Sequence, residues 1–316
     1  MKLFFILGFS LLLHASVSEA QNLVVRVRTV KNSATVPELV KDSRVSQKIF
    51  KKENGLYDVI TLVSMNDYLA GVLSKEMPLS WPEEALKAQA VVARSFLLAR
   101  MSDRSQKKFH VESDQMDQVF SLTDSAKAYK AVRETENVFL MSAKNKILKA
   151  FYHSDCGGQT VPASQVWSGA DDSGTAKDPW CAVRESNRWS FAVSAEFFNQ
   201  KTQALDRNEL GTVYYKDRLM NYAGISLQKM REIFGFSVIR NSPLIVSADN
   251  QQIVFKGQGF GHGAGLCQWG SRYLAQKGRS YLDILKHYYP KALISDNKIK
   301  LAQFKSKLFN DLTFKM

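Results

Sequence analysis

The segment "WPEEALKAQAVVARSFLLARM", residues 81–101, constrains the fold more than any other feature of the chain. The preceding serine gives the pattern SWPE at residues 80–83, which fits a capping box with an early proline and predicts the start of a helix. From Ala85 to Leu97 this helix is apolar nearly all round, and helices of that kind are buried. We therefore expect an α+β protein in which central buried helices are flanked by β-rich segments, forming a single large domain.

Arg94 is the only charged residue between Lys87 and Arg100 of this helix. A cation on a buried helix needs a partner, because an unpaired charge inside a protein is costly. The guanidinium could contact an oxygen of a substrate, and Arg94 is therefore a candidate substrate-binding residue. Alternatively, the long side chain could keep its charged end in water.

The N-terminus, "MKLFFILGFSLLLHASVSEA", predicts a signal peptide over residues 1–20. Lys2 supplies the positive start, an apolar run follows, and Ser18-Glu19-Ala20 has the small-x-small pattern of a cleavage site. The apolar run is too short to span a membrane, and no later segment is long and apolar enough. We expect an exported protein, either periplasmic or secreted to the cell wall.

The chain carries 43 Lys and Arg against 30 Asp and Glu, a formal net charge of +13. Outside the cytoplasm, this charge favours anionic wall polymers or lipid head groups over nucleic acid as partners. A basic surface that is simply solvated explains the charge equally well.

The remaining chain divides into three parts. Residues 21–54 form a β-rich N-terminal segment, where "LVVRVRTV" alternates apolar and basic positions as a half-buried strand does. Residues 55–290 contain the helices and glycine-rich turns of the expected main domain, including a hairpin with its turn at residues 143–145. Residues 291–316 form a basic tail that could lie on the surface as a helix.

One carboxylate, Glu76, ends a mostly apolar run just before Pro78. A helix starting at Ser64 or Asn66 places it on one face with apolar residues at spacings of three and four, namely Leu69, Val72 and Leu73. It also lies in the last turn, beside backbone carbonyls. Both surroundings disfavour the carboxylate, so we expect a raised pKa and a general acid suited to glycosidic cleavage. A Glu turned to solvent, or paired with a nearby Lys, is the alternative.

Three cysteines, Cys156, Cys181 and Cys267, are too few for a disulfide scaffold. In an oxidising compartment two of them could pair and leave the third free. His153 and Cys156 could begin a zinc site, with one of the other cysteines joining from a distance, but no second CxxC or HxxxH completes it. His153 and Ser154 do not make a nucleophilic dyad, because no G-x-S-x-G accompanies them. We expect no required cofactor and keep zinc as an alternative.

The segment "GQGFGHGAGLCQWGS" follows a predicted strand and precedes a predicted helix. It resembles a dinucleotide-binding fingerprint, but it lies too near the C-terminus for a following βαβ unit, so we reject that interpretation. The alternating glycines instead predict a tight turn with exposed amides. His262, Gln268 and Trp269 could then form a wall for a sugar, with polar groups for hydroxyls and an aromatic face for a ring. A purely structural turn is the alternative.

Three blocks together resemble the SpoIID/LytB family: "YLAGVLSKEMPLSWPEEALKAQAVVARSFLLAR", "FYHSDCGGQTVPASQVWSG" and "FKGQGFGHGAGLCQWGSRYLAQKGRSYLDILKHYYP". The resemblance covers roughly residues 55–290. It implies an exported protein acting on peptidoglycan, and its sporulation members are lytic transglycosylases that cut glycan strands lacking stem peptides. The glutamate of the family's EMP-like stretch, their catalytic acid, falls on Glu76. Some members bind zinc through His and Cys, although Cys267 stands where sporulation members often have Ser.

This resemblance implies cleavage of the bond between N-acetylmuramic acid and N-acetylglucosamine to 1,6-anhydro products, with Glu76 as the catalytic residue. The partners expected are glycan strands and an N-acetylmuramoyl-L-alanine amidase. Two alternatives are a hydrolytic muramidase and a non-catalytic wall-binding protein that stimulates an amidase. Six residues are candidate substrate contacts: Arg94, His153, Ser154, His262, Gln268 and Trp269.

Overall fold

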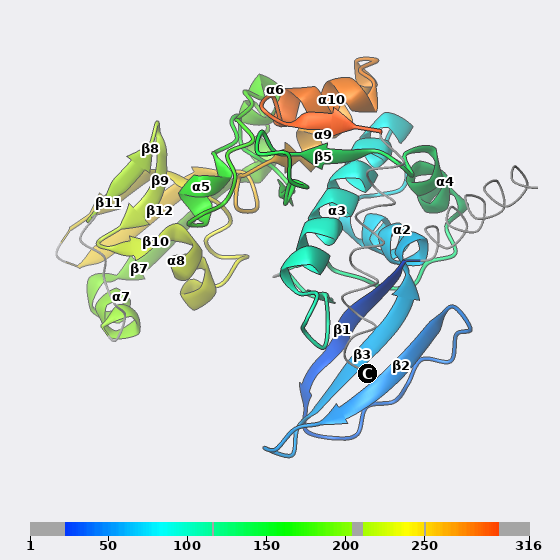
Figure 1. Ribbon diagram of the computed structural model, residues 1–316. Coiled ribbons are helices and arrows are strands. Elements are labelled where there is room, and N and C mark those ends of the chain that lie inside the picture. The colour runs from blue at the N-terminus through cyan, green and yellow to red at the C-terminus, as the bar shows by residue number, and fades with distance from the viewer. Residues whose placement is uncertain (1–22, 116, 204–210, 250, 297–316) are drawn as a thin grey trace, which may run out of the picture. The chain divides into compact units, whose positions relative to one another are not determined.

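A computed structural model describes residues 23–115, 117–203, 211–249 and 251–296 (Figure 1). The predicted signal peptide, residues 1–20, and most of the basic tail lie outside the described residues. The chain divides into two compact units, described below one at a time. Unit 1 comprises Met1–Trp81, Ala93–Leu140 and Ser295–Met316, and unit 2 comprises Pro82–Val92 and Met141–Ile294. Both contain helices and small sheets, which confirms the predicted α+β class.

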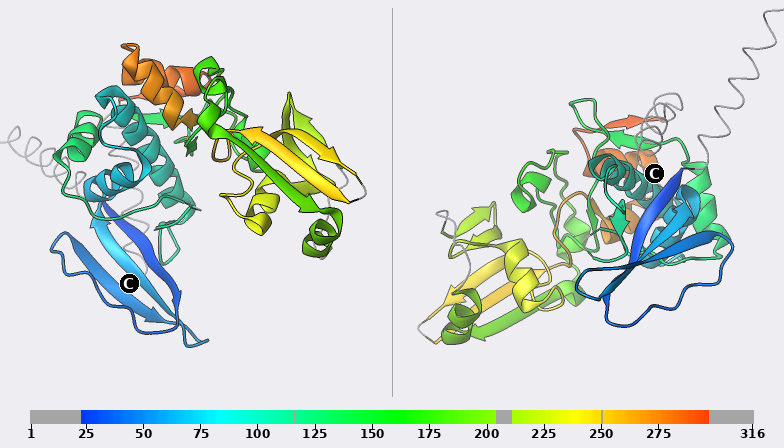
Figure 2. Two further views of the ribbon diagram at one scale, coloured as in Figure 1. Left: turned by 180° about the vertical axis from the view of Figure 1, so that it is seen from behind. Right: turned by 60° about the horizontal axis from the view of Figure 1, so that its bottom comes forward.

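Unit 1 contains a four-stranded sheet in the order β2-β3-β1-β4. Its strands are β1 (Val24–Ser33), β2 (Val45–Lys51), β3 (Tyr57–Ser64) and β4 (Val111–Glu112). The first three pair antiparallel and β4 runs parallel to β1; the views of Figures 1 and 2 show β1, β2 and β3 side by side. Since β3 pairs with both β1 and β2, the boundary predicted at residues 54 and 55 falls inside a hairpin of this sheet.

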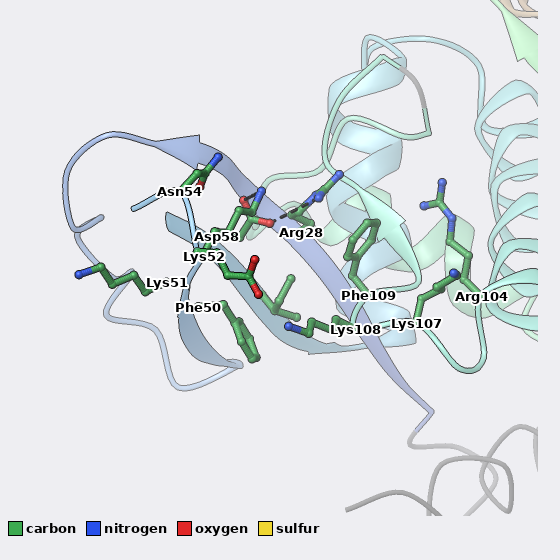
Figure 3. Close-up of a pocket in the computed structure, with 12 residues that line it drawn as sticks. Arg28, Phe50, Lys51, Lys52, Asn54, Asp58, Arg104, Lys107, Lys108 and Phe109 are labelled. Atoms are coloured by element: carbon green, nitrogen blue, oxygen red, sulfur yellow. Dashed lines mark hydrogen bonds and ion pairs between the residues drawn. The ribbon is translucent and has the colours of Figure 1, made fainter. Parts of the chain in front are cut away.

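The alternation predicted for the first strand is confirmed. Val25 and Val27 are buried, while the arginines between and after them lie on the opposite face. These arginines are not simply solvated: Arg26 donates a hydrogen bond from Nε to His110 at 3.1 Å, and Arg28 pairs with Asp58 at 3.4 Å (Figure 3). Side-chain hydrogen bonds and ion pairs therefore stabilise the polar face of the sheet.

Two of the helices of unit 1 were predicted from the sequence. Helix α2 (Met65–Glu76) starts after Ser64, whose hydroxyl accepts the Asp67 N–H, and ends at Glu76 as predicted. Helix α3 (Glu83–Asp103) starts three residues later than the predicted cap, and its residues 83–92 group with unit 2. Most of its residues between 88 and 99 are fully buried, which confirms the predicted central helix. Helix α4 (Ala126–Glu134) packs against α2.

Unit 2 contains two three-stranded antiparallel sheets. One has the order β11-β12-β7 and the other the order β10-β9-β8. The strands are β7 (Arg188–Ser194), β8 (Val213–Tyr215), β9 (Arg218–Tyr222), β10 (Ile225–Ser226), β11 (Pro243–Ala248) and β12 (Gln252–Gln258). Helices α7 (Ala195–Thr202) and α8 (Leu227–Phe234) share with these strands a core that includes Trp189, Phe198, Met230 and Phe255.

The rest of unit 2 consists of short elements joined by turns. They are β6 (Tyr152–His153), α5 (Ala163–Val166), α6 (Pro179–Ala182), the 3-10 helix η1 (Glu185–Asn187), β13 (Leu266–Cys267), α9 (Gln268–Gln276) and α10 (Tyr281–Tyr288). Strands β5 (Phe139–Met141) and β14 (Leu293–Ser295) lie at the unit boundaries. The predicted hairpin turn is confirmed by an antiparallel bridge between Met141 and Ile147. Among the described residues, no helix is both long and apolar enough to cross a membrane.

Candidate functional site

Glu76 is the last residue of α2 and lies above a buried apolar face. Leu69, Val72 and Leu73 have no exposed surface, as their spacing predicted, whereas Glu76 is partly exposed. Met77 follows it with an extended backbone and donates its N–H to the carbonyl of Leu73. The carboxyl group is therefore held at a helix end, with apolar side chains below it and access to solvent above.

Tyr68 is a buried side chain that interacts electrostatically with this carboxyl group. Its phenol is fully buried and donates a hydrogen bond to Oε1 of Gln118 at 3.1 Å. Burial raises the pKa of Tyr68 well above its usual value, and the nearby charges of Asp117 and Glu76 raise it further. The Tyr68 phenol therefore strongly favours its neutral form, and it lies close enough to Glu76 for the two side chains to interact electrostatically.

Arg94, predicted as a substrate contact, forms hydrogen bonds with backbone carbonyls of its own chain. It is fully buried, and its Nη1 donates to the carbonyls of Thr135 at 2.7 Å and Val138 at 3.1 Å, while Nη2 donates to the carbonyl of Val132 at 2.9 Å. These carbonyls lie at and just after the end of α4, where helical carbonyls lack partners along the chain. The guanidinium therefore supplies donors to the carbonyls of a helix end, which indicates a structural role for Arg94.

In unit 2, two turns far apart in the sequence lie against each other. Strands β6 and β13 pair in parallel, with His153 opposite Cys267. The glycine-rich turn then runs back along the first turn, through bridges between Asp155 and Phe260 and between Val161 and Ala264. The predicted second and third family blocks therefore form one structure.

This close approach requires glycine at one position above all. Gly265 has a φ of +72°, and a Cβ there would lie 1.9 Å from the carbonyl oxygen of Phe151. The tight turn predicted from the alternating glycines is confirmed, since four of them have positive φ angles, namely Gly259, Gly261, Gly263 and Gly265.

The two histidines predicted as sugar contacts are neighbours. Their ring centroids lie 5.6 Å apart, and Nδ1 of His153 lies 3.0 Å from the carbonyl oxygen of Ala264. Nδ1 of His262 accepts the Ala264 N–H at 3.1 Å, so the neutral ring carries its proton on Nε2. Burial, together with the nearby His153 and Arg231, lowers the pKa of His262 well below its usual value. His262 is therefore a neutral hydrogen-bond donor.

An aromatic side chain that the sequence reasoning missed lies beside His262. The ring of Trp167 is 4.7 Å from the His262 ring and stacks at 4.1 Å on Phe151. The sequence signal that could have indicated it is its place in the second family block, within "VWSG". It is a better aromatic partner for His262 than Trp269, which the sequence singled out.

The other predicted contacts surround the start of α9. Trp269 donates its N–H to the carbonyl of Ser154 at 3.1 Å, which brings these two residues together. The guanidinium of Arg184 covers the Trp269 ring at 3.5 Å from its centroid. Gln268 is buried and Ser154 is partly exposed. An arginine thus covers a face of the ring that was expected to meet a sugar.

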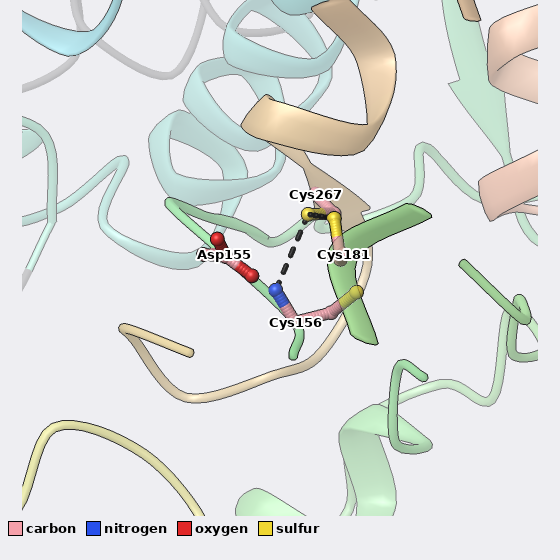
Figure 4. Close-up of side chains that lie close together, drawn as sticks. All are labelled: Asp155, Cys156, Cys181 and Cys267. Carbon is pink, nitrogen blue, oxygen red and sulfur yellow. Dashed lines mark hydrogen bonds between the residues drawn. The ribbon is translucent and has the colours of Figure 1, made fainter. Parts of the chain in front are cut away.

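The three cysteines converge, although they come from three separate segments (Figure 4). All are buried and free, and donor atoms of Asp155, Cys156, Cys181 and Cys267 lie within 4.8 Å of one another. The sulfurs of Cys181 and Cys267 are 3.8 Å apart, far longer than a disulfide bond. The structure therefore contains no disulfide between Cys181 and Cys267.

The sulfur of Cys267 accepts hydrogen bonds that favour its thiolate form. Its sulfur caps α9, accepting the Gly270 N–H at 3.4 Å, and also accepts the Cys156 N–H at 3.2 Å. Burial opposes a charge here, but hydrogen bonds from Cys156, Cys181 and His153 lower the pKa of Cys267 well below its usual value. A helix N-terminus stabilises a thiolate in the same direction.

This donor set fits a thiophilic cation such as Zn²⁺. Zinc–sulfur bonds of about 2.3 Å in a tetrahedron place two sulfurs roughly 3.8 Å apart, which is the separation of Cys181 and Cys267. This set of ligands differs from the predicted zinc site, which began with His153 and Cys156. In the structure Cys156 lies with the other two cysteines and Asp155, and His153 is not part of the group. The Asp155 carboxylate also binds Arg184 at 2.6 Å, so the three thiols are the stronger part of the set.

Asp178 is a further residue that the sequence reasoning missed. It is fully buried and binds His287 Nε2 at 2.8 Å, the hydroxyl of Tyr288 at 2.6 Å and the thiol of Cys156 at 3.2 Å. This carboxylate connects α10 to the cysteine cluster. The dipeptide "DP" before Trp180 gave no signal of this role.

Comparisons with known proteins agree with the sequence resemblance. The SpoIID family model, described as Stage II sporulation protein, matches residues 53–141, a segment that includes Glu76. Stage II sporulation protein D of Bacillus amyloliquefaciens is 28% identical over 306 residues, covering 88% of this chain and 87% of that protein. The protein of the same name from Bacillus subtilis (strain 168) is 26% identical over 306 residues, with the same coverage of both chains.

A third relative has a different name. The Amidase enhancer of Bacillus subtilis (strain 168) is 25% identical over 284 residues, covering 70% of this chain and 39% of that protein. The predicted resemblance is therefore confirmed: residues 53–141 match the SpoIID family model, and similarity to proteins named Stage II sporulation protein D extends over most of the chain.

Proposed function

We propose that the protein is a lytic transglycosylase that cleaves the β-1,4 bond between N-acetylmuramic acid and N-acetylglucosamine in peptidoglycan glycan strands. The observation that supports this most is the position of Glu76. Its carboxyl group ends α2 above a buried apolar face, is open to solvent, and lies in the segment that matches the SpoIID family. This is the kind of setting in which a carboxylic acid acts as a proton donor.

In the proposed reaction, Glu76 protonates the glycosidic oxygen as its bond to the anomeric carbon breaks. The C6 hydroxyl of the same muramyl residue attacks that carbon, and the Glu76 carboxylate accepts the hydroxyl proton. The product is a 1,6-anhydro sugar and Glu76 regains its proton. A single acid is sufficient because the nucleophile belongs to the substrate, whereas a hydrolase normally uses a second carboxylate.

Asp155, a carboxylate on the paired turns of unit 2, is poorly suited to act as the second carboxylate of a hydrolase. It is buried and its Oδ2 accepts hydrogen bonds from Arg184 at 2.6 Å and Asn187 at 2.9 Å. This supports transglycosylation over hydrolysis.

The proposed sugar contacts lie on the paired turns of unit 2: His153, Ser154, His262, Gln268 and Trp269, with Trp167 added by the structure. We propose that His262, which is partly exposed, contacts a sugar oxygen. We further propose export to the periplasm or cell wall, a preference for strands lacking stem peptides, and cooperation with an amidase. The relative named Amidase enhancer supports only the last of these.

We also propose that the three thiols and Asp155 hold a zinc ion. When bound, the cation would link the segments of Cys156, Cys181 and Cys267 and so fix the paired turns of unit 2. Cys267, whose sulfur accepts two backbone N–H groups, is the best prepared of the three thiols to bind the cation as a thiolate.

Mass spectrometry of products from purified peptidoglycan, with and without stem peptides, tests the proposed reaction. Anhydro-muramyl ends support it. Reducing-end sugars would identify a muramidase. Intact glycan, with faster cleavage by an added amidase, would identify a non-catalytic enhancer.

A further inference from the structure

A basic hollow lies in unit 1, and Glu76 is not among the residues that line it. It has a volume of about 860 Å³ and lies between the β2–β3 turn and the loop that follows α3 (Figure 3). Its volume falls in the range of ligand-binding clefts. Two carboxylates and six basic residues line it, the latter being Arg28, Lys51, Lys52, Arg104, Lys107 and Lys108.

Three of these cations are already paired. Arg28 and Lys52 both contact Asp58, at 3.4 and 2.9 Å. Arg104 contacts Asp117 at 2.7 Å. These pairs shape the hollow and leave little positive charge for a ligand.

The other three cations are unpaired. Lys51 at the end of β2, and Lys107 and Lys108 in the loop after α3, are exposed and form no ion pair with any residue that the structure describes. Like charges gathered around a concave surface repel one another and raise the local positive potential. An anion that binds there relieves this repulsion.

The aromatic rings of the hollow are occupied by cations. Arg28 lies over the Phe109 ring at 4.1 Å and Arg104 at 5.4 Å, while Lys108 lies 5.4 Å from the centre of the Phe50 ring. Proteins that bind single-stranded nucleic acid need free rings on which bases can stack. The rings of this hollow are therefore poorly placed to stack on bases.

We propose that the basic hollow binds a flexible phosphodiester polymer without bases, of the poly(glycerol phosphate) type. The available donors are lysine ammonium groups, which bind phosphate oxygens as point charges, while the planar guanidinium groups are already engaged. The hollow is concave and so admits a chain more readily than a flat bilayer. Such a site goes beyond the proposed glycan cleavage, since it would hold the protein on an anionic polymer.

The test measures binding of poly(glycerol phosphate) to the full mature chain by isothermal titration calorimetry. Three lysine contacts predict that affinity falls roughly 20-fold between ~50 and ~200 mM salt. The triple variant Lys51→Gln, Lys107→Gln and Lys108→Gln should bind on the order of 10-fold more weakly at ~50 mM salt and lose most of this salt dependence.

The matched control removes three exposed lysines of unit 2, through Lys177→Gln, Lys256→Gln and Lys286→Gln. It changes the net charge equally and should bind as the parent protein does. Equal weakening by both triple variants would overturn the proposal, because charge alone would then explain binding. Tighter binding to single-stranded DNA, to poly(glutamate) or to phosphatidylglycerol vesicles would also overturn it, as would no binding. Circular dichroism of both variants verifies their folds.

Discussion

Replacing Arg94 by Met tests whether this arginine stabilises the fold or binds the substrate. The substitution keeps an apolar stem of similar length but removes the donors to the carbonyls of Val132, Thr135 and Val138. A buried carbonyl left without its donor costs about 1–3 kcal/mol. With some relaxation of the chain after α4, we expect a loss of about 3–5 kcal/mol in local stability.

Hydrogen exchange followed by mass spectrometry provides the assay, because it reports local opening in a chain of two units. Peptides covering α4 and the chain to residue 140 should exchange about 100-fold faster or more in Arg94→Met, since each 1.4 kcal/mol is a tenfold change. Arg133→Met is the matched control: Arg133 is exposed in the same helix, so exchange should change little. If Arg94→Met left exchange unchanged and weakened glycan binding instead, the structural role would be refuted.

Two further predictions concern pH and metal. Burial, aided by the charge of Arg26, lowers the pKa of His110 to about 3. The unfolded chain, in which the pKa is about 6.5, therefore takes up a proton at a higher pH than the folded protein does. The free energy of unfolding should be highest above pH ~6.5 and fall by up to about 1.4 kcal/mol per pH unit from there toward pH 3. Chemical denaturation at several pH values should show this slope, and His110→Asn should flatten it; an equal slope in the variant would contradict the assignment. For the thiols, one equivalent of Co²⁺ should give sulfur-to-metal charge-transfer absorption that Cys181→Ser weakens, and an unchanged spectrum in that variant would count against the cluster.

Some of this structure could be predicted because its signals are local. The spacing of Leu69, Val72, Leu73 and Glu76 lies within three turns of one helix, so the buried face of α2 could be derived from the sequence. The same holds for α3, whose unbroken apolar surface implies burial whatever surrounds it.

The cysteine cluster could not be predicted, because it depends on pairing between distant segments. Cys156 and Cys267 are 111 residues apart and meet only because β6 and β13 run in parallel. Likewise, Arg94 was correctly seen to need a partner, but its partners are backbone carbonyls about 40 residues further on, and carbonyls have no signature in a sequence.

The rate of glycan cleavage by Glu76→Gln tests the central claim most directly. The amide cannot donate or accept the proton, so formation of anhydro-muramyl ends should fall by at least about 100-fold. Glu134→Gln is the matched control, since Glu134 is the last residue of α4 as Glu76 is of α2, and it should cleave at the parent rate. Undiminished anhydro products from Glu76→Gln would contradict the account.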